Sequence, residues 1–80
     1  MSDVKNITVY GTGCKSCEQL HANALEAIDR IGSLAKVDYI TDIVAIAEAG
    51  IMSTPALAID GQVVSMGKVL NTKTIETLLG

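Results

Sequence analysis

Alternating and helix-spaced apolar positions predict seven elements in the order βαβαββα. β-branched residues alternate over residues 6–10, and a Gly-Thr-Gly turn follows before apolar side chains recur at helical spacing. The predicted elements are a strand at 6–10, a helix at 14–32, a strand at 35–40, a helix at 42–49, strands at 56–60 and 62–66, and a closing helix capped by Asn71 or Thr72.

The connections between these elements predict a mixed sheet. A strand, a helix and a second strand imply a parallel pair joined by a right-handed crossover. The pair Asp60-Gly61 between the last two strands is a strong type I′ hairpin signal, so those strands are predicted to be antiparallel. The fold class is therefore α/β.

Each predicted helix has its apolar positions gathered on one part of its surface. Glycines end the first two helices, at Gly32 and Gly50. The long helix carries Cys17, Leu20, Ala24, Ala27, Ile28 and Ile31 on one face, opposite a solvated face. Apolar positions cover half the surface of the short helix, at Ile43, Val44, Ile46 and Ala47, and the last helix is predicted to face inward with Ile75, Leu78 and Leu79.

Composition and charge exclude several classes of function. With 80 residues and 49% hydrophobic residues, the chain is expected to form a single domain over residues 1–80. A net charge of −3 and only two aromatic residues, both Tyr, argue against nucleic-acid binding. No apolar run approaches the about 20 residues that span a bilayer, and no signal peptide is evident. We expect a cytoplasmic protein without membrane contact.

Cys14 and Cys17 form a Cys-x-x-Cys pair at the start of the long helix. A helix N-terminus presents free N–H groups and the positive end of its dipole, and both stabilise a thiolate. We therefore predict that Cys14 is the nucleophile toward a disulfide. Cys17 lies one turn further, on the same face, and is predicted to resolve the mixed disulfide. Lys15 and Glu18 carry opposite charges and are assigned no net effect.

Other interpretations of the two cysteines remain open from the residues alone. They could be small buried hydrophobic residues, or two thiolates that carry a soft metal such as Cu(I), as the Gly-x-Gly-Cys-x-x-Cys of small copper chaperones does. A redox-regulated binding module is a third possibility. A closed zinc site is not expected, because His21 is the sole further Cys or His ligand. His21 could instead move a proton or lie on the surface.

A resemblance favours the redox interpretation. The segments YGTGCKSC, STPALAIDG and SMGKV, with the helix end at Gly50, are similar to the small redox-active disulfide proteins of archaea and bacteria, a minimal thioredoxin-like family. The resemblance implies a four-stranded mixed sheet of order 2-1-3-4 flanked by three helices. It also implies a cis-proline loop at Thr54-Pro55 opposite the cysteines, whereas copper chaperones have a βαββαβ order and no such loop.

The resemblance further implies the activity and its partners. Cys14 and Cys17 correspond to the redox pair of a thiol-disulfide oxidoreductase, and the substrate surface is expected at Gly13, Lys15, Ser16, Thr54 and Pro55. A disulfide-containing protein would be the substrate and a reductase the electron donor, with no cofactor, no metal and a monomeric chain. The tryptophan, glycine and proline of the thioredoxin motif are absent here, and the position of its buried carboxylate is Thr8.

Overall fold

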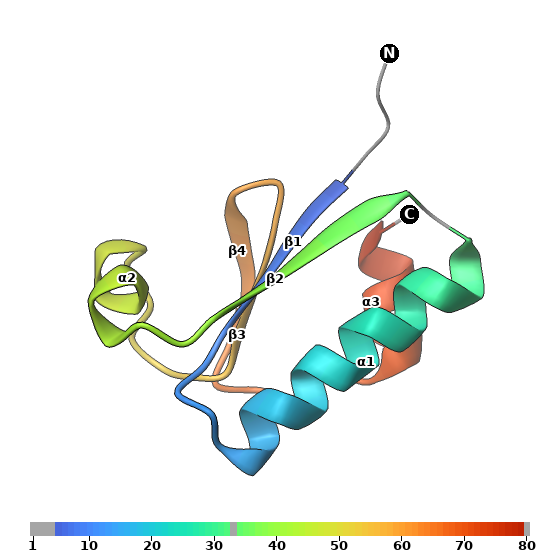
Figure 1. The fold of residues 1–80 in the computed structure, drawn as a ribbon. Helices are drawn as coiled ribbons and strands as arrows, with labels where there is room; N and C mark the ends of the chain where they lie inside the picture. The colour runs from blue at the N-terminus through green and yellow to red at the C-terminus, as the bar shows by residue number, and fades with distance from the viewer. Residues whose placement is uncertain (1–4, 33, 80) are drawn as a thin grey trace.

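The predicted order of elements is confirmed by the computed structural model, which describes residues 5–32 and 34–79 (Figure 1). The elements are β1 (Lys5–Tyr10), α1 (Lys15–Ile31), β2 (Ala35–Ile40), α2 (Ile43–Glu48), β3 (Ala56–Ile59), β4 (Gln62–Met66) and α3 (Thr72–Leu79). The strands form one sheet of order β2-β1-β3-β4, as the resemblance implied. β1 runs parallel to β2 and antiparallel to β3, so the sheet is mixed.

The predicted hairpin joins β3 and β4 through Asp60 and Gly61. Both residues have positive φ, 51° and 84°, as a type I′ turn requires. Asp60 also links this turn to β1: its Oδ1 accepts the N–H of Asn6 at 3.0 Å, and its own N–H donates to the Asn6 carbonyl at 2.7 Å. One aspartate therefore fixes the turn and the end of the central strand together.

The larger hydrophobic cluster lies between the sheet and the layer formed by α1 and α3 (Figure 1). Its buried members are Ile7, Val9, Leu20, Ala24, Ala27, Leu57, Ile75 and Leu79. On the apolar faces predicted for α1 and α3, two residues are not buried: Ile31 is 40% exposed and Leu78 is 42% exposed. Ile31 ends a 17-residue helix of about 25 Å, longer than a six-residue strand of about 20 Å, so the helix overhangs the sheet.

Leu78 is exposed because the face of α3 that is buried is formed by Ile75 and Leu79. Ile75 and Leu79 are four residues apart and share one face of α3, and both are buried. Leu78 is rotated about 100° from Leu79 around the helix axis and therefore points toward β4 instead. The buried face of α3 therefore includes Ile75 and Leu79 but not Leu78.

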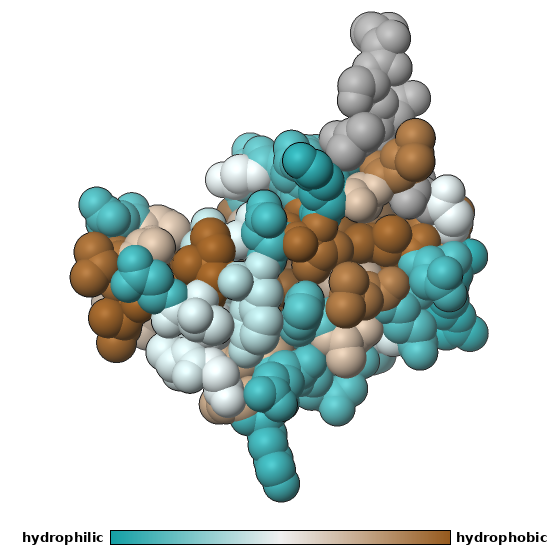
Figure 2. Space-filling view, viewed as in Figure 1, coloured by the Kyte–Doolittle hydropathy of each residue, from teal (hydrophilic) through white to brown (hydrophobic). Residues whose placement is uncertain are grey.

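A smaller cluster covers one end of the opposite face of the sheet. Ile46 of α2 packs there with Ile51 and Ala56, against partly buried Tyr10 and Ile40. Of the four apolar positions predicted on half the surface of α2, only Ile46 is buried: Ile43 is 69% exposed, and Val44 and Ala47 are also exposed. A six-residue helix makes fewer than two turns and buries only Ile46. Figure 2 shows apolar side chains on the surface where α2 lies.

In the described part of the chain, no helix has the length and hydrophobicity needed to span a membrane.

Candidate thiol-disulfide site

Cys14 and Cys17 lie where β1 passes into α1, and their sulfurs are joined in a disulfide. Their Cα atoms are 5.1 Å apart. Cys14 is the N-cap of α1, with the extended backbone that a cap needs, and Cys17 lies within the first turn. The predicted positions of both cysteines relative to the helix are confirmed.

The helix terminus donates directly to the first sulfur. The N–H of Cys17 points at the Sγ of Cys14 over 3.2 Å, and the N–H of Glu18 donates to the Cys14 carbonyl at 3.0 Å. An N–H donor and the positive end of the helix dipole both favour negative charge on this sulfur. After reduction, the same geometry stabilises a Cys14 thiolate.

The two cysteines differ sharply in exposure. Cys14 is exposed, whereas Cys17 has 0% of its surface exposed and lies against Gly11. Gly13, Lys15 and Ser16 are exposed around Cys14. An incoming disulfide can therefore contact Cys14, whereas Cys17 is not accessible from the solvent.

Thr54 and Pro55 lie at the same end of the sheet as the cysteines. Tyr10, which precedes the cysteine loop, pairs with Ala56, which follows Pro55. The Thr54–Pro55 peptide bond is cis; Thr54 is partly buried and Pro55 is buried. Strand pairing thus brings the two segments, some 40 residues apart in sequence, to neighbouring strand ends.

Gly67 holds the proline segment from the other side. Its N–H donates to the Pro55 carbonyl at 2.8 Å. Gly67 also has a φ of 72°, and a Cβ there would lie 3.2 Å from the Cβ of Ser53. Because both the positive φ and the close approach favour glycine, the end of β4 fixes where the proline segment lies.

His21 and Thr8 both lie against residues of β2. The ring of His21 is partly buried and packs on Tyr39, with centroids 4.7 Å apart and an interplanar angle of 37°. Thr8 is partly buried within β1, opposite Asp38 of β2. Over residues 5–32 and 34–79, no three His, Cys, Asp or Glu side chains gather as ligands for a metal ion.

Gly11 is a feature of the site that sequence reasoning assigned only to a turn. It is buried, and its N–H donates to the Ile40 carbonyl at 3.0 Å. A Cβ on Gly11 would lie 2.5 Å from both the Cβ and the Sγ of Cys17. The glycine three residues before Cys14 was visible in the sequence, but its contact with Cys17 depends on tertiary structure.

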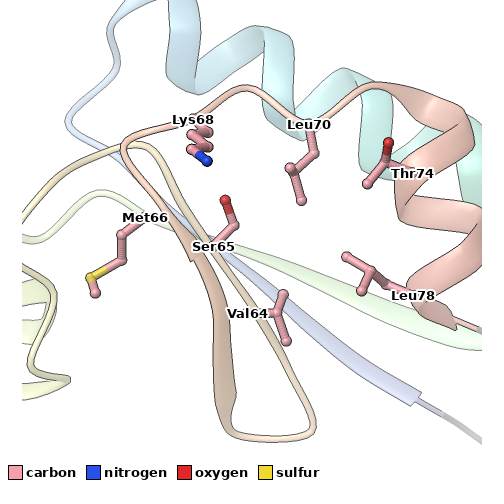
Figure 3. A pocket seen from close by; sticks show the side chains of 7 residues that line it. All are labelled: Val64, Ser65, Met66, Lys68, Leu70, Thr74 and Leu78. Atoms are coloured by element: carbon pink, nitrogen blue, oxygen red, sulfur yellow. The ribbon is translucent and has the colours of Figure 1, made fainter.

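A pocket of about 490 Å³ lies apart from the cysteines, between β4 and α3 (Figure 3). Its lining residues are Val64, Ser65, Met66, Lys68, Leu70, Thr74 and Leu78. Figure 3 shows Leu78 extending from α3 toward the β4 side of the pocket. The Ser65 hydroxyl oxygen is buried and has no hydrogen-bond partner among the described residues. Neither Cys14 nor Cys17 lines this pocket.

Comparisons with known proteins agree with this geometry. A family model described as "Thioredoxin domain" matches residues 5–80. The chain is 40% identical over 73 residues to a protein named thioredoxin from Methanothermobacter thermautotrophicus, covering 91% of this chain and 95% of that one. It is 34% identical over 70 residues to a thioredoxin from Methanocaldococcus jannaschii, covering 88% and 80% respectively. None of these matches supports the soft-metal carrier considered from the sequence.

Proposed function

The chain belongs to the thioredoxin domain family, and from this premise we propose that Cys14 and Cys17 are the working pair of a thiol-disulfide oxidoreductase. The observation that carries the assignment is the unequal environment of the two sulfurs. Cys14 is exposed and its sulfur accepts a helix N–H, whereas Cys17 is fully buried behind it. The Cys14 sulfur can therefore react with a substrate disulfide first, and the Cys17 sulfur reacts in the second step.

The reaction proceeds in two thiol-disulfide exchanges. The Cys14 thiolate attacks one sulfur of the substrate disulfide, which breaks that bond and releases the second substrate sulfur as a thiolate. The thiol of Cys17 then loses its proton, and its sulfur attacks the Cys14 sulfur of the mixed disulfide. The remaining substrate thiolate leaves and is protonated. Two electrons have passed to the substrate, and the protein holds the Cys14–Cys17 disulfide seen in the structure.

We assign substrate contact to the rim of this site. Exposed Gly13, Lys15 and Ser16 surround Cys14, and Thr54 with Pro55 forms the neighbouring strand end. Backbone groups of such an irregular segment can pair with an extended peptide that carries the target disulfide. The physiological substrate would then be a disulfide-containing protein, and a separate reductase would return the electrons. We further propose that residues 1–80 act as one monomeric domain in the cytoplasm, without a cofactor.

Single-cysteine variants test the order of attack, with 5,5′-dithiobis(2-nitrobenzoate) as the disulfide probe. The reduced Cys17→Ser variant is expected to release one equivalent of the coloured thiolate and to retain a stable mixed disulfide on Cys14, detectable by mass. The wild-type protein is expected to release two equivalents and retain no adduct, because Cys17 displaces the second thiolate.

Cys14→Ser is the matched control, because it leaves one thiol in the same loop. Its sulfur is buried, so the same reaction is expected to be at least tenfold slower than in Cys17→Ser. Equal rates for the two variants would contradict the assigned roles. A wild-type protein that keeps the adduct would show that Cys17 does not resolve it.

A further inference from the structure

The space beside Cys17 exists because residue 11 has no side chain. If residue 11 carried a Cβ, that atom would lie 2.5 Å from both the Cβ and the Sγ of Cys17 and 3.6 Å from the Cys17 Cα. Carbon and sulfur atoms in contact normally lie at about 3.5–4.0 Å. Gly11 has no positive φ, so its backbone would accept another residue. Glycine is therefore needed at position 11 because it leaves room for Cys17, and not because of its backbone conformation.

Neither partner of this contact can move away easily. The N–H of Gly11 is bound to the Ile40 carbonyl, and Tyr10 immediately before it pairs with strands on both sides. Cys17 belongs to α1, is fully buried, and donates its N–H to Cys14. An added methyl group would therefore have to displace the first turn of α1 or the Cys17 side chain.

We propose that Gly11 is a positioning residue of the redox couple, whose missing Cβ provides the space that Cys17 occupies in the disulfide form. This inference rests on the proposed function, because it concerns the same pair of cysteines. Gly11 touches neither a substrate nor a cofactor and acts only through where it lets the Cys17 sulfur lie.

The two oxidation states depend on this space to different degrees. In the disulfide, the bond to Cys14 fixes the direction of the Cys17 sulfur, so the sulfur cannot rotate away from a side chain at position 11. In the dithiol, rotation about the Cα–Cβ bond of Cys17 can remove the contact with the sulfur, although the contact with the Cβ stays. A methyl group at position 11 thus destabilises the oxidised protein more than the reduced protein.

The experiment is a redox equilibrium of Gly11→Ala against dithiothreitol, with far-UV circular dichroism to verify folding. In this exchange the protein dithiol gives two electrons and two protons to the cyclic dithiothreitol disulfide, and the products are the protein disulfide and the dithiothreitol dithiol. We expect the equilibrium constant for forming the protein disulfide to fall at least tenfold, which is about 30 mV toward a more oxidising couple. An unchanged constant in the folded variant would overturn the proposal.

Gly32→Ala is the control variant: it also replaces a glycine by alanine, but the new Cβ does not contact Cys17. Gly32 caps the far end of α1 with a φ of 63°, and a Cβ added to it would meet no atom within 4 Å outside its chain neighbours and the backbone of its own helix. The substitution is expected to reduce stability through backbone strain and to leave the redox equilibrium within twofold of the wild type. An equal shift in both variants would mean that general destabilisation, and not the space beside Cys17, moves the couple.

A second comparison applies if Gly11→Ala does not fold in the wild-type background. The same substitution is then made in Cys17→Ala, which removes the sulfur from the contact. The proposal requires that the loss of unfolding free energy in urea be smaller in this background; an equal loss, or failure to fold in both, overturns it. Failure of the wild-type protein to equilibrate reversibly with dithiothreitol would instead refute the proposed function, so the two failures can be told apart.

Discussion

Two apolar residues of α3 should contribute very unequally to stability, although both were predicted to face inward. Ile75 is fully buried in the larger cluster, and Leu78 is 42% exposed. Each substitution to alanine removes three carbons, worth about 2.4 kcal/mol when fully buried at ~0.8 kcal/mol per carbon. For Ile75 the cavity left behind adds to this, giving about 3–4 kcal/mol. For Leu78 only the buried 58% counts, giving about 1.4 kcal/mol.

Urea unfolding of Ile75→Ala and Leu78→Ala, followed by far-UV circular dichroism, measures the loss of unfolding free energy in each variant. Both transitions are analysed with the same urea dependence of the free energy and the same baselines. A loss of about 3 kcal/mol is a large share of the about 5–15 kcal/mol of a small protein, so a clear shift of the midpoint is expected for Ile75→Ala. Leu78→Ala should shift it by less than half as much. Equal shifts would refute the assignment of Ile75 to the core and of Leu78 to the pocket wall.

Three further outcomes are expected. In the reduced wild-type protein, iodoacetamide should modify Cys14 at least tenfold faster than buried Cys17, as mapped by peptide mass; comparable rates would contradict the exposure difference. Asn71→Ala should cost about 1 kcal/mol in urea unfolding, because the Asn71 side chain accepts the Thr74 N–H at 2.7 Å; no loss would mean that the cap is not needed. Tyr39→Phe should not lower the melting temperature, because the buried Tyr39 hydroxyl has no partner within the described ranges, and a drop of several degrees would reveal one.

Local signals in the sequence were enough for the elements and for the placement of Cys14. Asp60-Gly61 predicts its turn because positive φ is required at both positions, and few residue pairs tolerate that. Gly32 ends α1 for a similar reason. The N-cap position of Cys14 follows from the glycine turn before it and the helical spacing after it. These features depend on residues within one or two turns of each other.

The depth of burial could not be predicted in the same way. Ile43 and Val44 are as apolar as Ile46, yet only Ile46 meets the sheet, because a short helix touches the sheet end through one face. The spacing of apolar residues gives the face of a helix but not how far the neighbouring layer extends. Gly11 illustrates the same limit at the site, since its need for space comes from Cys17 folding back onto the strand end.

The smaller cluster sets how the cysteine loop and the proline segment can fluctuate. Its buried residues Ile46, Ile51 and Ala56 pack against Tyr10, which leads into the cysteine loop, and Ala56 itself follows Pro55. Local opening requires less free energy where few apolar side chains must separate. We therefore expect the Ile51 amide, bonded to the Ile46 carbonyl, to exchange its hydrogen through a partial opening that leaves the α1 and α3 layer closed. The proline segment that follows Ile51 would then move without unfolding of the whole protein.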